Sequence, residues 1–334
     1  MQSCLKSNQN DMSMITRFKE FNFLYHNEFQ YFCFKNCLYQ FLQLTEIENP
    51  LLFIKVGFQL IVDKGTYQIP RYVNTNPLFN MNYFEFGYGM DFLSTFERNL
   101  SELPVIVITD VYHLPYRKEY LKLHGSHAVF LIGSEKSKVH IMDWYAPYFF
   151  KGYIDITDFE KARTSTHIGN SNPFCEKEIQ NFWYKPQNDI LNINVADNVI
   201  ENYNSIFSIS GDHMETSYSG IEAFEALIVF IREYQFSDVQ FMKIFCKNLH
   251  NELLLYIRSA RLAYLYFTNA IEKYAGLIDK QLLIHLENCI CFLDRLGMNL
   301  LKASLSMPGR YIQAIIKDID NTKNEILKIS HLGI

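Results

Sequence analysis

Several kinds of segment are missing from this 334-residue sequence, and each absence narrows the functional classes open to it. No apolar run approaches the ~18 residues that would span a bilayer, and the polar first residues lack the apolar stretch of a secretory signal. Lys and Arg total 31 against 36 Asp and Glu, so the net charge of −5 leaves no basic surplus to neutralise a nucleic-acid backbone. We therefore expect a cytoplasmic protein that binds neither membranes nor nucleic acids.

Cysteine is also sparse, and its spacing is irregular. Seven cysteines, an odd and scattered set, are typical of a protein from a reducing compartment rather than of a disulfide framework. No Cys/His group has the spacing of a metal site. Cys289 and Cys291 lie within a helical pattern, and we interpret them as packing residues. The sequence predicts no metal and no bound cofactor.

What is present indicates a globular protein of two domains. Apolar residues make up 49% of the chain, with 28 Phe and 22 Tyr, enough for a full-sized core. The length suggests about two domains at roughly 150 residues each. Mixed helical and strand patterns give way to helical patterns near residue 200. We expect an α+β domain at 1–205 and a helical domain at 206–334, with a linker at 208–220.

Within the first domain, apolar spacing predicts a helix at 30–44. An apolar run predicts a buried strand at 104–110, and two further strands at 127–132 and 138–143 are predicted to pair through a turn at 133–137. Amphipathic patterns of the second domain predict a bundle or helical cap. Its expected helices lie at 221–231, 238–273, 279–305 and 309–330.

Three residues from separate segments form a candidate catalytic group. Cys33 precedes the apolar run of the first helix, where free N–H groups favour a thiolate and can stabilise an oxyanion. His127 opens a strand, and Asp143 ends the strand predicted to pair with it. This Asp could fix the imidazole of His127, which would take the proton of the thiol.

Alternatives remain at each position of this group. Cys37 is the rival nucleophile, although a place inside the helix should make it inert. His124 is the rival base. Asn27 or Gln30 could donate to the oxyanion, and the spacing does not decide between them. Asp110 would either bind a substrate amine or simply end its strand.

The residues from Pro104 to Trp144 follow a specific order. A strand ends in Asp, a His-Leu-Pro-Tyr segment follows, a His opens a strand that runs into Gly, and an Asp closes the next strand. This order resembles the N-terminal domain of the family of the butirosin-biosynthesis acyltransferase H. The matching positions are Asp110, His113–Tyr116, His127, Gly133 and Asp143.

Shorter stretches at 32–38, 156–163 and 219–224 are similar to this family's Cys-containing helix start, closing helix and helical C-terminal part. The layout is also similar to papain-like peptidases that trim bacteriocin leader peptides. Two residues depart from these patterns. Phe32 stands where a polar residue or His is usual, and Trp144 replaces a common Pro.

The resemblance implies a papain-like fold in which Cys33 is the nucleophile, His127 the base and Asp143 its orienting partner. It implies acyl transfer in natural-product biosynthesis, for example of antibiotics. The acyl or aminoacyl donor would be a thioester on the phosphopantetheine arm of an acyl or peptidyl carrier protein. The acceptor would be a small molecule that bears an amine.

Carrier proteins are typically acidic, so docking would need a local basic patch on this chain. The candidates, whose alternative interpretation is an ordinary solvated face, are Arg117, Lys118, Lys122, Lys136 and Lys138. A thioesterase or cysteine peptidase with the same triad is the second functional class, and a scaffold with a decayed triad is the third. The apolar bundle helices are also compatible with a homodimer.

Overall fold

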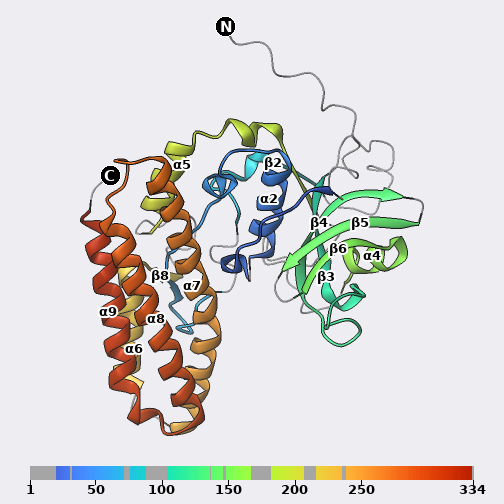
Figure 1. The fold of residues 1–334 in the computed structure, drawn as a ribbon. Coiled ribbons are helices and arrows are strands. Elements are labelled where there is room, and N and C mark those ends of the chain that lie inside the picture. The colour runs from blue at the N-terminus through green and yellow to red at the C-terminus, as the bar shows by residue number, and fades with distance from the viewer. Residues whose placement is uncertain are drawn as a thin grey trace. The chain divides into compact units, whose positions relative to one another are not determined.

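A computed structural model describes residues 20–30, 32–70, 76–87, 104–135, 137–145, 148–166, 182–206, 216–234 and 238–332 (Figure 1). The chain divides into two compact units. Unit 1 comprises Met1–Pro50 and Asn80–Asn192, and unit 2 comprises Leu51–Phe79 and Ile193–Ile334. This division differs from the predicted domains 1–205 and 206–334, because the early segment Leu51–Phe79 packs with the late part of the chain.

Unit 1 contains a six-stranded antiparallel sheet with the order β2-β7-β3-β4-β5-β6. Its strands are β2 (Phe84–Gly87), β3 (Val105–Asp110), β4 (Ser126–Glu135), β5 (Lys138–Tyr145), β6 (Tyr148–Asp155) and β7 (Trp183–Pro186). The sheet confirms the α+β class. It also confirms the predicted strand at 104–110 and the predicted pair that follows it.

The turn between β4 and β5 is shorter than predicted. The turn was expected at 133–137, but β4 continues to Glu135 and β5 starts at Lys138. A shift in register between Leu131 and Gly133 marks an irregularity in the ladder, after which Gly133 pairs with His140. Ser134, Glu135 and Lys138 therefore belong to the ladder although they are polar.

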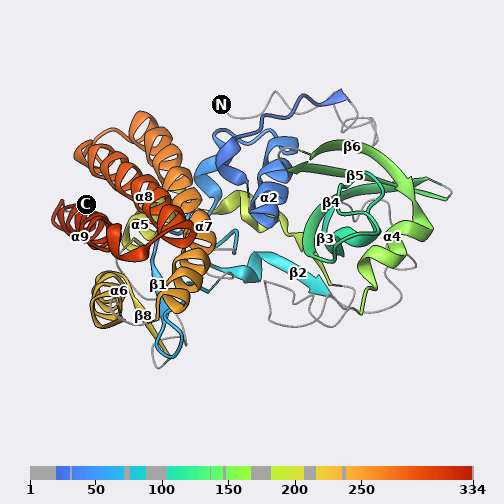
Figure 2. The same ribbon diagram turned by 90° about the horizontal axis from the view of Figure 1, so that it is seen from below.

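Two helices cover the sheet of unit 1, α2 (Cys33–Leu44) and α4 (Ile156–Arg163). They lie on opposite sides of it (Figure 2). Phe159 and Ala162 of α4 pack on β-branched strand residues such as Val107, Val129 and Ile141, side chains that suit a pleated, buried surface. The prediction of a helix at 30–44 is confirmed for Cys33–Leu44.

Unit 2 consists mainly of helices, together with a two-stranded sheet formed by β1 (Ile61–Asp63) and β8 (Ser217–Ser219). The helices are α5 (Val195–Asn204), α6 (Ile221–Tyr234), α7 (Val239–Lys273), α8 (Gln281–Leu305) and α9 (Ile312–Ser330). The four longest confirm the predicted helical patterns. The prediction of a linker at 208–220 is wrong at β8, because this strand forms a ladder with Ile61–Asp63.

Short 3-10 helices complete the fold at Asn27–Phe29, Pro50–Phe53, Met81–Tyr83, Val111–His113, Asn188–Asn192 and Pro308–Arg310. Within the described part of the chain, no helix is both long and apolar enough to cross a membrane.

Candidate functional site

Cys33 is the first residue of α2, and it lies against the start of β4. Its flanking residues Phe32 and Phe34 are buried, at 2% and 1% exposure, and this packing fixes where the helix begins. Cys33 itself is half-buried, and its Sγ accepts a hydrogen bond from the N–H of Ala128 at 3.4 Å. The first N–H groups of a helix have no acceptor within the helix. The thiol therefore lies beside donors that can stabilise negative charge.

His127 and Asp143 form a buried pair on β4 and β5. Nε2 of His127 lies 2.8 Å from Oδ1 of Asp143, and both residues are 4% exposed or less. The register that pairs Phe130 with Met142 sets Asp143 diagonally across from His127 on the same face of the sheet. The predicted hairpin therefore brings the two residues together.

The protonation of His127 links this pair to Cys33. Burial alone would lower the pKa of His127, but the charge of Asp143 and hydrogen bonds with Asp143 and Cys33 raise it to about 9. Because Nε2 faces the carboxylate, Nδ1 is the ring nitrogen left to face the thiol. The three predicted residues thus form one connected group, with the imidazole between the sulfur and the carboxylate.

The second oxygen of Asp143 is held by two residues of the segment between β3 and β4. Oδ2 accepts a hydrogen bond from Oη of Tyr116 at 3.0 Å and one from Nη1 of Arg117 at 3.3 Å. Tyr116 also stacks on Phe150, with 4.1 Å between ring centroids. Neither contact is predicted from the sequence. Nothing local signals them, since they span 27 and 26 residues of chain.

The burial of Arg117 excludes this residue from the predicted docking patch. It is only 8% exposed and is bound to Asp143 and Glu119, so it cannot be a surface contact. Lys118 and Lys122 are exposed, and Lys138 lies over the ring of Tyr153 at 4.1 Å. Lys136 lies outside the described residues.

The rival nucleophile Cys37 is in an unfavourable position. Its Sγ is buried and donates to the carbonyl of Ala128 at 3.7 Å. Burial, together with the nearby charges of Cys33 and Asp143, raises the pKa of Cys37 well above its ordinary value. A thiol in such a position remains protonated and inert at neutral pH.

The rival base His124 belongs to a different cluster, centred on Asp110. Nδ1 of His124 lies 2.7 Å from Oδ2 of Asp110, and the same oxygen accepts from Ser165 at 2.6 Å. The other carboxylate oxygen accepts from the N–H groups of Tyr112 and Gly125. Burial alone would raise the pKa of Asp110, but these hydrogen bonds lower it. The carboxylate is saturated by internal partners, which favours a structural role over binding of a substrate amine.

The two oxyanion candidates lie just before α2. Asn27 starts the 3-10 helix Asn27–Phe29 and is exposed, whereas Gln30 is half-buried, and its N–H donates to the carbonyl of Asn27 at 3.0 Å. Both remain predictions. The N–H of Cys33 is a further donor at the site, because it belongs to the first turn of α2.

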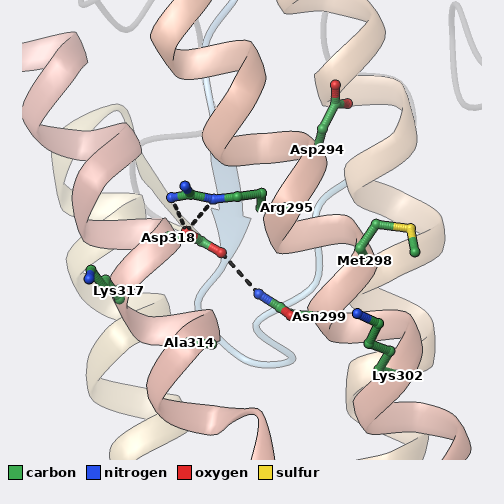
Figure 3. Close-up of a pocket in the computed structure, with 8 residues that line it drawn as sticks. All are labelled: Asp294, Arg295, Met298, Asn299, Lys302, Ala314, Lys317 and Asp318. Atoms are coloured by element: carbon green, nitrogen blue, oxygen red, sulfur yellow. Dashed lines mark hydrogen bonds and ion pairs between the residues drawn. The ribbon is translucent and has the colours of Figure 1, made fainter.

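A separate groove of about 530 Å³ lies between α8 and α9 of unit 2 (Figure 3). Its buried carboxylate, Asp318, accepts from Arg295 at 2.6 Å and from Asn299 at 3.0 Å. Lys302 and Lys317 also line the groove. The groove has no nucleophile or imidazole among its lining residues, so we assign it no chemistry.

Within the described residues, no group of three His, Cys, Asp or Glu side chains is arranged to hold a metal ion. Cys289 is buried, as expected for a packing residue. Cys291 is exposed, so the interpretation of this second cysteine as a packing residue is wrong. No protein-family model matches this sequence, and no curated protein matches it. The geometry of Cys33, His127 and Asp143 is therefore the feature that points to a function.

Proposed function

We propose that this protein is a cysteine-dependent acyltransferase of natural-product biosynthesis whose unit 1 is a papain-like catalytic domain. The observation that carries the proposal is the position of the His127 imidazole. It hydrogen-bonds to the helix-start thiol of Cys33 and, through Nε2, to the buried carboxylate of Asp143. This order of groups is that of nucleophile, base and orienting acid in covalent acyl transfer.

The first half-reaction transfers the acyl group to the enzyme. Cys33 Sγ attacks the carbonyl carbon of a thioester on the phosphopantetheine arm of an acyl or peptidyl carrier protein. A carbon–sulfur bond to Cys33 forms, the bond to the carrier thiol breaks, and the proton from Cys33 passes through His127 to that thiol. One thioester replaces another, so the step needs positioning and oxyanion stabilisation more than driving force.

The second half-reaction transfers the acyl group to the amine of a small-molecule acceptor. The amine nitrogen attacks the acyl-enzyme, His127 takes its proton and returns it to the sulfur of Cys33, and an amide is released. The N–H of Cys33 and the first turn of α2 stabilise the oxyanion in both steps. A single donor of this kind contributes roughly 10²–10³-fold to a rate.

The test is to incubate the protein with carrier proteins loaded with different acyl and aminoacyl groups. Intact-mass spectrometry should show an acyl adduct that Cys33→Ala abolishes and that Cys37→Ala retains. Adding an amine to the acylated enzyme should then give an amide. Release of the free acid instead would identify a thioesterase or peptidase, and failure to form any adduct with every donor would contradict covalent catalysis.

A further inference from the structure

Behind the triad, the structure places two more charged residues in line. Asp143 Oδ2 lies 3.3 Å from Nη1 of Arg117, and Nε of the same Arg117 lies 3.3 Å from Oε2 of Glu119. The side chains of Arg117 and Asp143 are 6% and 2% exposed, and that of Glu119 is 14% exposed. Glu119, Arg117, Asp143 and His127 therefore form a chain of alternating charge that ends at the thiol of Cys33.

Burying the charge of Arg117 is costly, because a guanidinium loses its hydration and only good partners compensate for that loss. Apolar packing alone can hold the segment between β3 and β4 in place, as the stacking of Tyr116 on Phe150 illustrates. The carboxylate of Asp143 is instead divided, with Oδ1 facing the imidazole and Oδ2 facing the guanidinium. The two oxygens of Asp143 thus have different partners, an imidazole and a guanidinium.

We infer that Arg117 is a positioning residue that limits how strongly Asp143 holds the imidazolium of His127, with Glu119 in turn limiting Arg117. This inference rests on the proposed function. Both half-reactions need His127 to accept a proton and then to release it. A lone carboxylate would retain the imidazolium and slow that release, whereas a competing cation leaves the ring able to act in both directions.

The charges around His127 come from three directions. Cys33 faces it from α2 and Asp143 faces it from β5, while the buried thiol of Cys37 on α2 lies near Cys33 and Asp143. Tyr116, Arg117 and Glu119 lie behind Asp143 in the segment between β3 and β4. Asp110 and His124 are paired with each other. Within the described part of the chain, Arg117 is the basic side chain in the segment between β3 and β4 that directly contacts the carboxylate of Asp143.

The test measures the pH midpoint of the His127 imidazole by NMR, with its signal identified by its loss in His127→Gln. Removing the cation in Arg117→Gln should raise the midpoint by about one pH unit. Removing the anion in Glu119→Gln should lower it, by about half a unit. Arg117→Lys should keep it near the wild-type value. Lys122→Gln is the matched control, an exposed charge of the same segment, and should leave the midpoint unchanged.

The direction in which the pH midpoint of His127 shifts in Arg117→Gln distinguishes this positioning role from a role in holding the segment between β3 and β4 in place. If Arg117 only holds the segment in place, Arg117→Gln frees Asp143 to move, and the midpoint falls toward 6.5. That fall, or equal midpoints in Glu119→Gln and wild type, would overturn the inference. If Arg117→Gln does not fold, the Glu119→Gln and Arg117→Lys values decide. A wild-type midpoint near 6.5 with no acyl adduct on Cys33 would instead overturn the proposed function itself.

Discussion

Cys33 and Cys37 contact the two polar atoms of a single residue on the neighbouring strand. Sγ of Cys33 accepts from the N–H of Ala128 at 3.4 Å, and Sγ of Cys37 donates to its carbonyl at 3.7 Å. The two sulfurs are thus in opposite electrostatic settings, one beside a donor and the other beside an acceptor. An N–H favours a thiolate and a carbonyl favours a thiol.

This contrast predicts selective alkylation. Iodoacetamide at pH 7 should modify Cys33 faster than the exposed Cys291, since the imidazole of His127 lies beside the Cys33 thiol and can take its proton during attack. Cys37 should resist modification, and so should Cys246, because burial raises its pKa to about 11. Peptide mass mapping over time gives the rates. Modification of Cys37 before Cys33 would reverse the assignment of the nucleophile.

The two imidazoles of the segment give a second prediction. His127→Gln should slow acylation of Cys33 by roughly 10²–10⁴-fold, the usual contribution of a general base. His124→Gln should change the rate little, because His124 is bound to Asp110 and stacks on Tyr112 at 4.0 Å. Rapid-quench mass spectrometry of the acyl-enzyme measures both. A larger loss in His124→Gln than in His127→Gln would make His124 the base.

Stability should depend on pH through His127. Its pKa of about 9 in the folded protein exceeds the value of 6.5 expected in the unfolded chain. The folded state then holds the proton more tightly, so this contribution is complete below pH 6.5 and is lost as pH rises through 9. The stability difference between wild type and His127→Gln should shrink by roughly 3 kcal/mol over that range. Urea unfolding at pH 6 and 9.5 measures it, and a constant difference would contradict the assigned charge state.

The groove of unit 2 offers a test of buried against exposed ion pairs. Asp318 is 4% exposed, so Arg295→Ala leaves its carboxylate with Asn299 alone and should cost about 1–3 kcal/mol of unfolding free energy (Figure 3). Arg261→Ala is the matched control. Its partner Asp294 is 45% exposed and can be hydrated, so the cost should stay below about 1 kcal/mol. Equal costs in urea denaturation would show that burial of Asp318 does not matter.

Local patterns were sufficient to predict most elements and part of the site. Apolar spacing located α2, and continuous apolar runs located β3 and β4. The pair of His127 and Asp143 followed from a hairpin, whose register is a short-range property. These predictions succeeded because neighbouring residues decide them.

Long-range contacts explain what could not be predicted. The ladder of Ile61–Asp63 with Ser217–Ser219 joins segments that share no local pattern, so the division into units was missed. Arg117 was assigned to the surface because a sequence displays a charge but not its burial. Its partner Asp143 lies on another strand, and only the folded chain brings them together.

Because Leu51–Phe79 belongs to unit 2, this early segment finds its partners among residues that are synthesised much later. The carbonyl of Leu52 receives hydrogen bonds from Asn198 and Tyr266, which are 146 and 214 residues later. At about 5–20 residues per second, a ribosome needs roughly 10–40 seconds to deliver the second of these partners. Until then Leu51 and Phe53, which are 4% and 5% exposed in the folded protein, flank a carbonyl that has not yet gained both of its partners. Unit 2 is therefore completed only after most of the chain that follows α2 has been synthesised.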